Sequence, residues 1–366
     1  MGSTWGNRIK LSLFGESHGE GIGIVIDSLP AGIELDMNYI RQQMARRAPG
    51  NSSLATPRKE DDEVKILSGI FEGKTTGAPL CGIIYNNNTR SKDYSILKDT
   101  LRPSHSDYPA KVKYLGFNDY RGGGHFSGRI TAPLMFAGAI AMQMLQEKNI
   151  VIGSRIKSIH KTSDVRIDYS NINETLLKKL KAMAFPTLSE DISNAMKDEI
   201  LYAKNSGDSV GGVVETYIVN VPGGLGQPFF NSLESQIAHI VFSIPAIKGI
   251  EFGEGFDITT CKGSEANDPY TLENGKIICT QNSNGGILGG ISNSMPIVFR
   301  TAIKPTPSIS LQQDTVNILD MKNTKLKIEG RHDPCIVPRA LPVIEAAAAL
   351  VLLDNILERE GEVWKK

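Results

Sequence analysis

Cysteine is scarce in this sequence. The four cysteines, Cys81, Cys261, Cys279 and Cys335, are scattered, and no pair has the C-x-x-C spacing of a zinc or redox site. We therefore expect reduced thiols and no structural metal, as is usual for a protein of the cytoplasm.

An excess of charge is also missing. Lys and Arg total 40 and Asp and Glu total 40, so the formal net charge is zero. Nucleic-acid-binding domains usually carry a basic excess, and single strands are often held by exposed aromatic residues. Aromatic residues of all kinds make up only 7% of this chain. This composition argues against a nucleic-acid partner.

Long apolar segments are absent as well. The N-terminal stretch "MGSTWGNRIKLSLFG" lacks the apolar core of a signal peptide, and the longest uninterrupted apolar run, residues 346–353, is too short to cross a bilayer. We expect no membrane partner and a cytoplasmic location. With 366 residues, 40% of them hydrophobic, the chain is able to bury a substantial core.

Common phosphate-binding and catalytic motifs are missing too. The sequence has no Walker-type G-x-x-x-x-G-K-[ST], no dinucleotide fingerprint and no G-x-S-x-G nucleophile elbow. Its histidines lack the i, i+3 or i, i+4 spacing of metal ligands. The acidic run "KEDDEV" at 59–64 could serve metal-dependent phosphoryl transfer, but its place directly before an expected strand favours a solvated charge run. We expect no metal site.

Glycine, in contrast, is abundant and concentrated in particular loops. Residues 121–129 read "RGGGHFSGR" and precede an apolar segment with helical spacing over about 133–147. Consecutive glycines are costly, because each loses more backbone entropy on folding than any other residue. Such a loop suits a backbone that must approach a ligand closely.

Histidine and arginine gather around loops of this kind. Arginine pairs bidentately with carboxylate or phosphate, and a helix N-terminus favours an anion. No acidic residue lies between Arg121 and Arg129, so we expect unpaired arginines arranged for a polyanionic ligand; ordinary surface ion pairs are the alternative. The loop histidines are His18, His105, His125 and His332, and the arginines are Arg46, Arg47, Arg102, Arg121, Arg129, Arg331 and Arg339.

The two halves of the chain repeat one pattern. "LPAGI" at 29–33 corresponds to "VPGGL" at 221–225, "GKTTGAPL" to "GISNSMPI", and "RITAP" with its helix to "RALP" with its helix. Three correspondences in the same order indicate an ancient duplication. We predict a single α+β domain over residues 1–366, with pseudo-equivalent halves at about 8–149 and 211–360 and a peripheral segment at 150–210.

Four stretches together resemble the chorismate synthase family: "FGESHGEGIGIVIDSLPAG", "RPSHSDYPAKVKYLGFNDYRGGGHFSGR", "GGILGGISNSMPIVFRTAIKPTPS" and "GRHDPCIVPRALPVIEA". The resemblance implies a lyase that converts 5-enolpyruvylshikimate 3-phosphate to chorismate and phosphate by anti-1,4-elimination. It implies a requirement for reduced FMN without net redox change, with NADPH as a possible reductant. It also implies a βαβ sandwich with an internal pseudo-duplication, with mixed or antiparallel sheets around helices, and a homotetramer.

The resemblance also assigns roles to individual residues. His18 would lie near the leaving phosphate, His105 near the flavin ring, and Asp333 would assist proton removal, although a carboxylate there is also a plausible helix cap. The substrate-binding residues would be Arg47, Arg102, Arg129 and Arg339. The cofactor-binding residues would be His125, Phe126, Ser127, Ala246, Gly289, Lys304, Pro305, Thr306, Pro307, Ser308 and Arg331.

The chain departs from the family's commoner pattern at three places. Ser53 stands where many relatives carry a basic residue, Pro245 replaces a common Asn at a flavin-contacting turn, and His125 stands where an arginine is commoner. The rival function is a non-catalytic nucleotide- or RNA-binding module that uses the arginine and glycine loops. Loss of phosphate from the substrate with reduced FMN and no divalent metal separates the two.

Overall fold

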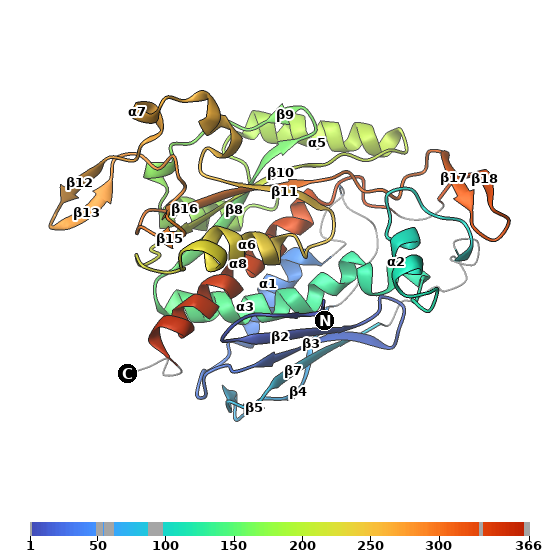
Figure 1. Cartoon of the computed structure of the whole chain (residues 1–366), viewed down its shortest axis with the longest axis horizontal. Coiled ribbons are helices and arrows are strands. Elements are labelled where there is room, and N and C mark those ends of the chain that lie inside the picture. Colours follow the sequence, from blue (N-terminus) through green and yellow to red (C-terminus); the bar gives the residue numbers. More distant parts are fainter. Residues whose placement is uncertain (1, 49–53, 55–61, 87–97, 329–331, 362–366) are drawn as a thin grey trace.

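The computed structural model describes residues 2–48, 54, 62–86, 98–328 and 332–361. Two five-stranded sheets enclose a layer of helices (Figure 1). Ser53 and Arg331 lie outside the described residues. The predicted α+β class is confirmed, and every strand pairing in both sheets is antiparallel.

The first sheet has the order β1-β2-β3-β7-β4 and the second has the order β11-β16-β10-β8-β9. The strands of the first are β1 (Thr4–Trp5), β2 (Lys10–Gly15), β3 (Gly21–Asp27), β7 (Leu80–Tyr85) and β4 (Lys65–Ser68). Those of the second are β11 (Ile247–Phe252), β16 (Ile297–Ile303), β10 (Gly212–Val219), β8 (Val151–Ile159) and β9 (Thr162–Ser163). Four hairpins complete the strands: β5 (Ile70–Phe71) with β6 (Lys74–Thr75), β12 (Tyr270–Glu273) with β13 (Lys276–Cys279), β14 (Ile287–Leu288) with β15 (Ile291–Ser292), and β17 (Gln313–Asn317) with β18 (Lys322–Leu326).

The helices between the sheets are α1 (Met37–Arg47), α3 (Thr131–Glu147), α6 (Leu233–Val241) and α8 (Val337–Glu360), and α8 packs against the other three. Further helices are α2 (Asp107–Lys113), α4 (Glu174–Ala182), α5 (Glu190–Asn205) and the short α7 (Gly263–Ala266). Figure 1 shows α5 above the second sheet, on the side away from α3 and α8.

The contact between α3 and α8 explains why both helices are rich in small apolar residues. A Cβ added at Gly138 would lie 2.2 Å from the Cβ of Ala346, so the two backbones approach too closely for larger side chains. Helix α8 is long and apolar enough to cross a membrane by length and composition, but 94% of its most apolar window is buried inside the protein. It is therefore the central helix of the core.

The two sheets are built in the same order. In each half a central strand, β3 or β10, leads through a Pro-Gly turn into a helix, α1 or α6, and then into the edge strand β4 or β11. Each edge strand also has a register shift against its neighbour, between Ile66 and Ser68 in β4 and between Ile247 and Gly249 in β11. This correspondence favours the predicted duplication, which stays a prediction until the halves are superposed.

One expectation about domain organisation is wrong. Segment 150–210 is not wholly peripheral, because it begins with β8, which pairs with β10 along its whole length. Residues 151–156 of β8 are buried. The second sheet therefore starts before residue 211, and β8 takes the place that β2 has in the first sheet.

Candidate active site

The glycine loop folds against the loop that carries His18. Gly122, Gly123 and Gly124 have φ angles of +58°, +86° and +52°, a backbone region that residues other than glycine rarely adopt. A Cβ at Gly122 would lie 2.2 Å from His18 Nδ1, and the Ser17 amide donates to the Gly124 carbonyl at 3.1 Å. At Gly122 the close approach that the glycines permit is thus an approach to His18 itself.

His125 uses both ring nitrogens to hold this loop in place. Its Nδ1 lies 2.8 Å from the Gly15 carbonyl and its Nε2 lies 2.9 Å from Ser3 Oγ. A carbonyl only accepts, so Nδ1 carries a proton and donates to Gly15, and Nε2 shares a hydrogen bond with the serine hydroxyl. The ring therefore anchors the glycine loop to the end of β2 and to the N-terminal segment, and its predicted contact with a cofactor stays a prediction.

The expectation of unpaired arginines is wrong, because a carboxylate pairs with each of these arginines that the structure describes. Arg47 and Arg129 both bind Asp62, the latter at 2.8 Å. A buried guanidinium without a partner is costly, which explains why acids from elsewhere complete these sites. The other pairs are Arg102–Asp107 at 2.7 Å, Arg121–Asp119 at 2.8 Å, Arg339–Asp333 at 2.6 Å and Arg46–Glu345 at 2.6 Å.

A second group of predicted residues forms where the 102–107 loop meets the segment after β16. His105 Nε2 lies 2.9 Å from Ser308 Oγ, its Nδ1 lies 3.0 Å from the Pro103 carbonyl, and Lys304 Nζ donates to the Ser104 carbonyl at 2.7 Å. Burial, with the nearby charge of Arg102, lowers the pKa of His105 to about 4. At neutral pH this imidazole is neutral, with its proton on Nδ1 and Nε2 accepting from the Ser308 hydroxyl.

Asp107, two residues after His105, is ionised. Burial raises the pKa of this carboxyl, but its hydrogen bonds to Arg102 and the charge of that guanidinium outweigh burial, and the pKa is lowered overall. Arg102 binds both carboxylate oxygens, through Nε at 2.8 Å and Nη2 at 2.7 Å. The pair is a rigid bidentate fork at the start of α2.

The turn before β11 joins this second group. Ala246 has a φ of +74°, uncommon for a residue with a Cβ, and its carbonyl accepts the Lys304 amide at 3.0 Å. Gly289 does not join it: it lies in the β14–β15 turn, before the start of β16, whereas Lys304 follows the end of that strand. The seven residues of β16 place the two segments roughly 20 Å apart along the strand.

Asp333 binds an arginine near the start of α8 and does not cap that helix. Helix α8 has Ile336 at its N-cap position without a side-chain cap, so the capping alternative for Asp333 is wrong. Asp333 pairs with Arg339 in the first turn of α8, and Arg339 Nε donates to the Arg47 carbonyl at 3.2 Å. His332 turns to the Ile328 carbonyl, at 3.3 Å.

Two residues that sequence reasoning missed connect these parts. Asp62 belongs to the acidic run that was interpreted as solvated, but its side chain is only 2% exposed. Asn86 accepts from Arg129 Nε at 2.8 Å and donates to the Glu16 and Gly19 carbonyls, both at 3.0 Å. Asn86 therefore ties Arg129 to the loop that carries His18, and nothing in its sequence context signals this.

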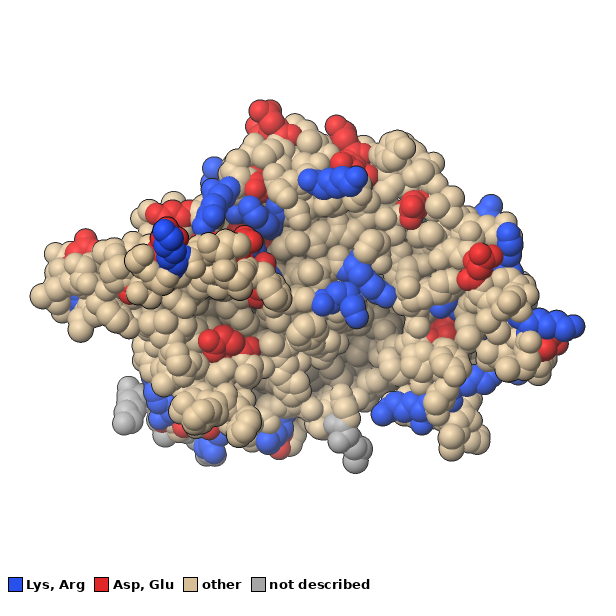
Figure 2. Space-filling view, turned by 45° about the horizontal axis from the view of Figure 1, so that its top comes forward, with Lys and Arg blue, Asp and Glu red and all other residues tan. Residues whose placement is uncertain are grey.

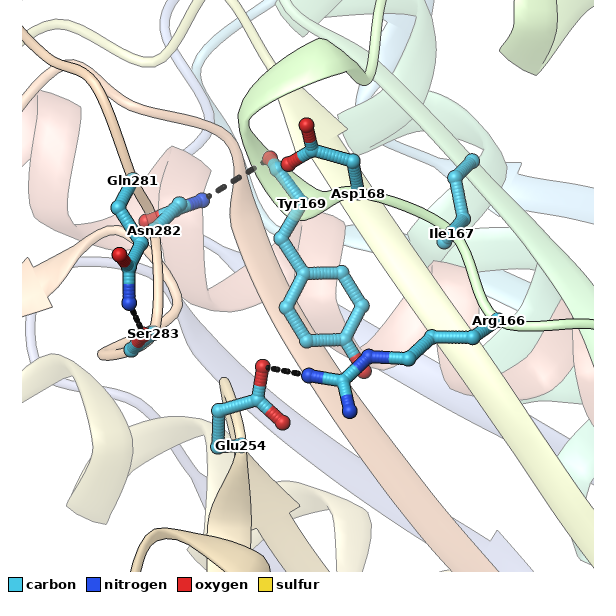
Figure 3. Close-up of a pocket in the computed structure, with 8 residues that line it drawn as sticks. All are labelled: Arg166, Ile167, Asp168, Tyr169, Glu254, Gln281, Asn282 and Ser283. Carbon is cyan, nitrogen blue, oxygen red and sulfur yellow. Dashed lines mark hydrogen bonds and ion pairs between the residues drawn. The ribbon is translucent and has the colours of Figure 1, made fainter. Parts of the chain in front are cut away.

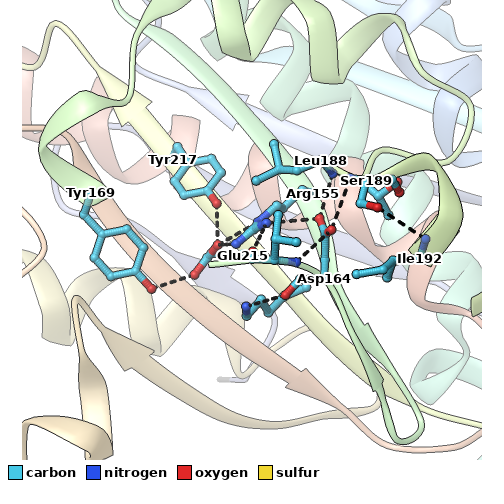
Figure 4. A network of polar contacts seen from close by, with 11 residues as sticks. Arg155, Asp164, Tyr169, Leu188, Ser189, Ile192, Glu215 and Tyr217 are labelled. Atoms are coloured by element: carbon cyan, nitrogen blue, oxygen red, sulfur yellow. Dashed lines mark hydrogen bonds and ion pairs between the residues drawn. The ribbon is translucent and has the colours of Figure 1, made fainter. Parts of the chain in front are cut away.

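The polar pocket in Figure 3 lies elsewhere, and none of its lining residues is a predicted site residue. Arg166 pairs with Glu254 across it at 2.5 Å, and Asn282 donates to the Tyr169 carbonyl. Tyr169 also contributes to the buried network of Figure 4, in which Arg155 binds Glu215 and Asp164. We assign this network to stability, because all its charges are satisfied within the protein.

Charge on the surface is mixed. Figure 2 shows basic and acidic side chains interspersed on one face, with a group of basic side chains beside a hollow near its centre. Among the residues that the structure describes, no group of three or more His, Cys, Asp or Glu side chains is arranged to hold a metal ion.

Comparisons with known proteins identify the family of this chain. The family model described as "Chorismate synthase" matches residues 9–357. The chorismate synthase of Methanobrevibacter smithii is 48% identical over 363 residues, 99% of this chain and 98% of the relative, and that of Thermococcus kodakarensis is 45% identical over 356 residues, 97% of this chain and 98% of the relative. A solved structure titled "Crystal Structure of Chorismate Synthase" superposes with a TM-score of 0.76 and 29% identity, covering 98% of this chain and 94% of that one. The chain therefore belongs to the chorismate synthase family, the chorismate-forming lyases of the shikimate pathway.

Proposed function

We propose that the loops around His18, Arg47, Arg129 and Asp333 bind 5-enolpyruvylshikimate 3-phosphate and carry out its conversion to chorismate and phosphate. The observation that supports this best is the link from Asp62 through Arg129 and Asn86 to the His18 loop. It brings guanidinium groups able to bind a polyanion to the same place as an imidazole able to hold a proton.

The substrate carries two carboxylates and a phosphate, and we assign their binding to Arg47, Arg102, Arg129 and Arg339. The side chains of these arginines are between 4% and 23% exposed. Hydrogen bonds between ionised groups are strong at such partly desolvated positions, and a planar guanidinium suits a carboxylate or phosphate better than an ammonium does.

In the elimination, the carbon–oxygen bond to phosphate breaks and its electron pair leaves with the phosphate. A ring carbon loses a proton, the electrons of that carbon–hydrogen bond form a new double bond, and the existing ring double bond shifts to the carbon that carried the phosphate. We assign His18 to the leaving phosphate, where an imidazolium donates a proton or stabilises the negative charge. We assign Asp333 to the ring proton, because Arg339 binds its carboxylate and also donates to the Arg47 carbonyl.

His105 has a different task from His18 in this proposal. It is neutral near pH 7, since its pKa is lowered to about 4 by burial and by Arg102. Ser308 fixes its Nε2. A neutral imidazole in this state is suited to orienting a bound ring system through hydrogen bonds and is a poor proton donor at neutral pH.

The family needs reduced flavin, and one feature of the second group fits a flavin. Among the described residues, Thr306 Oγ1 is buried without a hydrogen-bond partner. Gly289 lies outside the second group, and a Cβ there would meet no atom within 4 Å, so a ligand is able to approach its backbone. We propose that the flavin is FMN, held by His125, Phe126, Ser127, Ala246, Gly289, Lys304, Pro305, Thr306, Pro307 and Ser308; Arg331 lies outside the described residues. When bound, the reduced flavin supplies an electron-rich ring that favours departure of the phosphate and is unchanged at the end of the reaction.

We further propose a homotetramer in the cytoplasm, with NADPH as a possible reductant of the flavin. Light scattering on the purified protein measures the assembly, and an anaerobic assay with NADPH as sole reductant tests whether the chain reduces its own flavin. Formation of chorismate in that assay supports the reductase activity, and a strict requirement for dithionite contradicts it.

The experiment that tests the function is anaerobic release of phosphate and formation of chorismate with reduced FMN and no divalent metal. Equal amounts of both products support the assignment. Retention of the substrate, together with binding of RNA, would favour the non-catalytic alternative, which the family comparison does not favour.

A further inference from the structure

Asp62 is the meeting point of two predicted substrate-binding arginines. Arg47 Nη1 binds its Oδ2, and Arg129 Nη1 binds its Oδ1 at 2.8 Å. Each carboxylate oxygen thus serves a different guanidinium. The Asp62 side chain is 2% exposed, Arg47 is 4% exposed and Arg129 is 12% exposed, so the whole triad is withdrawn from water.

The fold fixes all three residues from different elements. Arg47 ends α1, Arg129 lies in the turn before α3, and Asp62 precedes β4. Val64, two residues after Asp62, packs against the hydrophobic core and holds this part of the chain in place. The triad therefore joins a helix end, a helix start and a sheet edge.

The guanidinium group of each arginine makes a second hydrogen bond, through Nε. Arg47 Nε donates to Thr131 Oγ1 at 3.1 Å, and Arg129 Nε donates to Asn86 Oδ1 at 2.8 Å. A guanidinium is a planar, rigid fork, so two contacts, one at Nε and one at Nη1, fix the direction in which its remaining edge points. Asp62 supplies the Nη1 contact in both cases.

The buried network around Arg155 shows what a purely structural arrangement of the same kind looks like. There one guanidinium binds two carboxylates, Glu215 at 2.7 Å and Asp164 at 3.0 Å, and all three side chains are at most 1% exposed (Figure 4). Asp62 instead bridges two guanidiniums, and one of them is also linked through Asn86 to the His18 loop. This link to a predicted site residue favours a role in the site over a purely structural one.

We propose that Asp62 is a positioning residue for chorismate formation: it holds Arg47 and Arg129 as one pre-formed anion-binding unit beside the His18 loop. The inference rests on the proposed roles of these two arginines in binding the substrate. A misplacement of binding groups by about 1 Å is able to cost on the order of 10²-fold in rate or affinity. Asp62 therefore acts on substrate binding through the two arginines, without touching the substrate.

The test compares Asp62→Asn and Asp62→Glu with Asp164→Asn as the matched control from the Arg155 network. We expect Asp62→Asn to raise KM for the substrate by roughly 10- to 100-fold, with kcat changed only a few-fold and FMN affinity unchanged in a fluorescence titration. Asp62→Glu keeps the charge but moves the carboxylate, so KM should rise by about 3- to 10-fold. Asp164→Asn should lower the unfolding temperature and leave KM as in the wild type.

A KM within twofold of the wild type in Asp62→Asn, or a lower KM, would overturn the proposal, because the carboxylate would then be structural only or would compete with the substrate. If Asp62→Asn does not fold, Asp62→Glu decides by the same twofold limit. Failure of the proposed function is distinguishable, since the wild-type protein itself would then release no phosphate with reduced FMN.

Discussion

Replacing Gly122 by alanine tests whether the glycine loop shapes the environment of His18. The new Cβ would lie 2.2 Å from His18 Nδ1 and 2.8 Å from Ser17 Oγ, so the imidazole has to move. The φ of +58° adds a backbone cost of about 1–2 kcal/mol for a residue with a Cβ. A displaced imidazole of this kind should lower the rate of phosphate release by about 10²-fold.

Gly116→Ala is the matched control. Gly116 also has a positive φ, +83°, but a Cβ there would meet no atom within 4 Å. Both variants should lose about 1–2 kcal/mol of unfolding free energy in urea titrations, and only Gly122→Ala should lose activity in the anaerobic phosphate-release assay. Equal turnover in the two variants would refute the idea that Gly122 is needed to leave room for His18.

Four further outcomes follow from the geometry. His18→Ala should slow phosphate release by roughly 10- to 10³-fold with FMN affinity intact; normal turnover at saturation would make His105 the better candidate for the leaving group. Asp333→Asn should lower turnover by about 10²-fold or more, and near-normal turnover would remove Asp333 from the proton transfer. The folded-state pKa of His105 is lowered to about 4, below its ordinary value of about 6.5, so the stability due to the neutral ring is present above pH 6.5 and is lost as the pH falls towards 4. His105→Gln should therefore flatten the pH–stability curve between these values, and an unchanged curve would contradict the assignment. Gly138→Leu should prevent α3 from packing on α8 and lower the unfolding temperature strongly in a thermal melt, because a Cβ alone already lies 2.2 Å from Ala346; an unchanged melting temperature would contradict the close helix contact.

Local patterns predicted the regular elements well. The apolar segment at 133–147 lies within α3, and the helix expected with "RALP" is α8. These elements carry strong periodicity and a buried face. The expectation that 150–210 is peripheral missed β8, because this strand is buried by pairing with β10, a contact between distant parts of the chain.

The sequence indicates which residues belong to the candidate site, but it does not indicate which residues contact one another there. The glycine loop, its histidine and its arginines stand out locally in the sequence. Asp62, however, lies 15 residues from Arg47 and 67 from Arg129, and no local count of acids associates the three. The same holds for His125, whose partners Ser3 and Gly15 lie 122 and 110 residues away. Pairing between distant residues, which the fold alone creates, occupies Arg46, Arg47 and Arg129. Arg102, Arg121 and Arg339 pair with carboxylates two to six residues away, which the sequence could have shown.

One anaerobic experiment tests whether this chain eliminates phosphate from 5-enolpyruvylshikimate 3-phosphate with reduced FMN and no net redox change. It follows phosphate, chorismate and the flavin absorbance together, without divalent metal. We predict phosphate and chorismate in a one-to-one ratio over many turnovers while the FMN stays reduced. Steady turnover with oxidised FMN under non-reducing conditions, or oxidation of one reduced FMN for each chorismate formed, would contradict the claim.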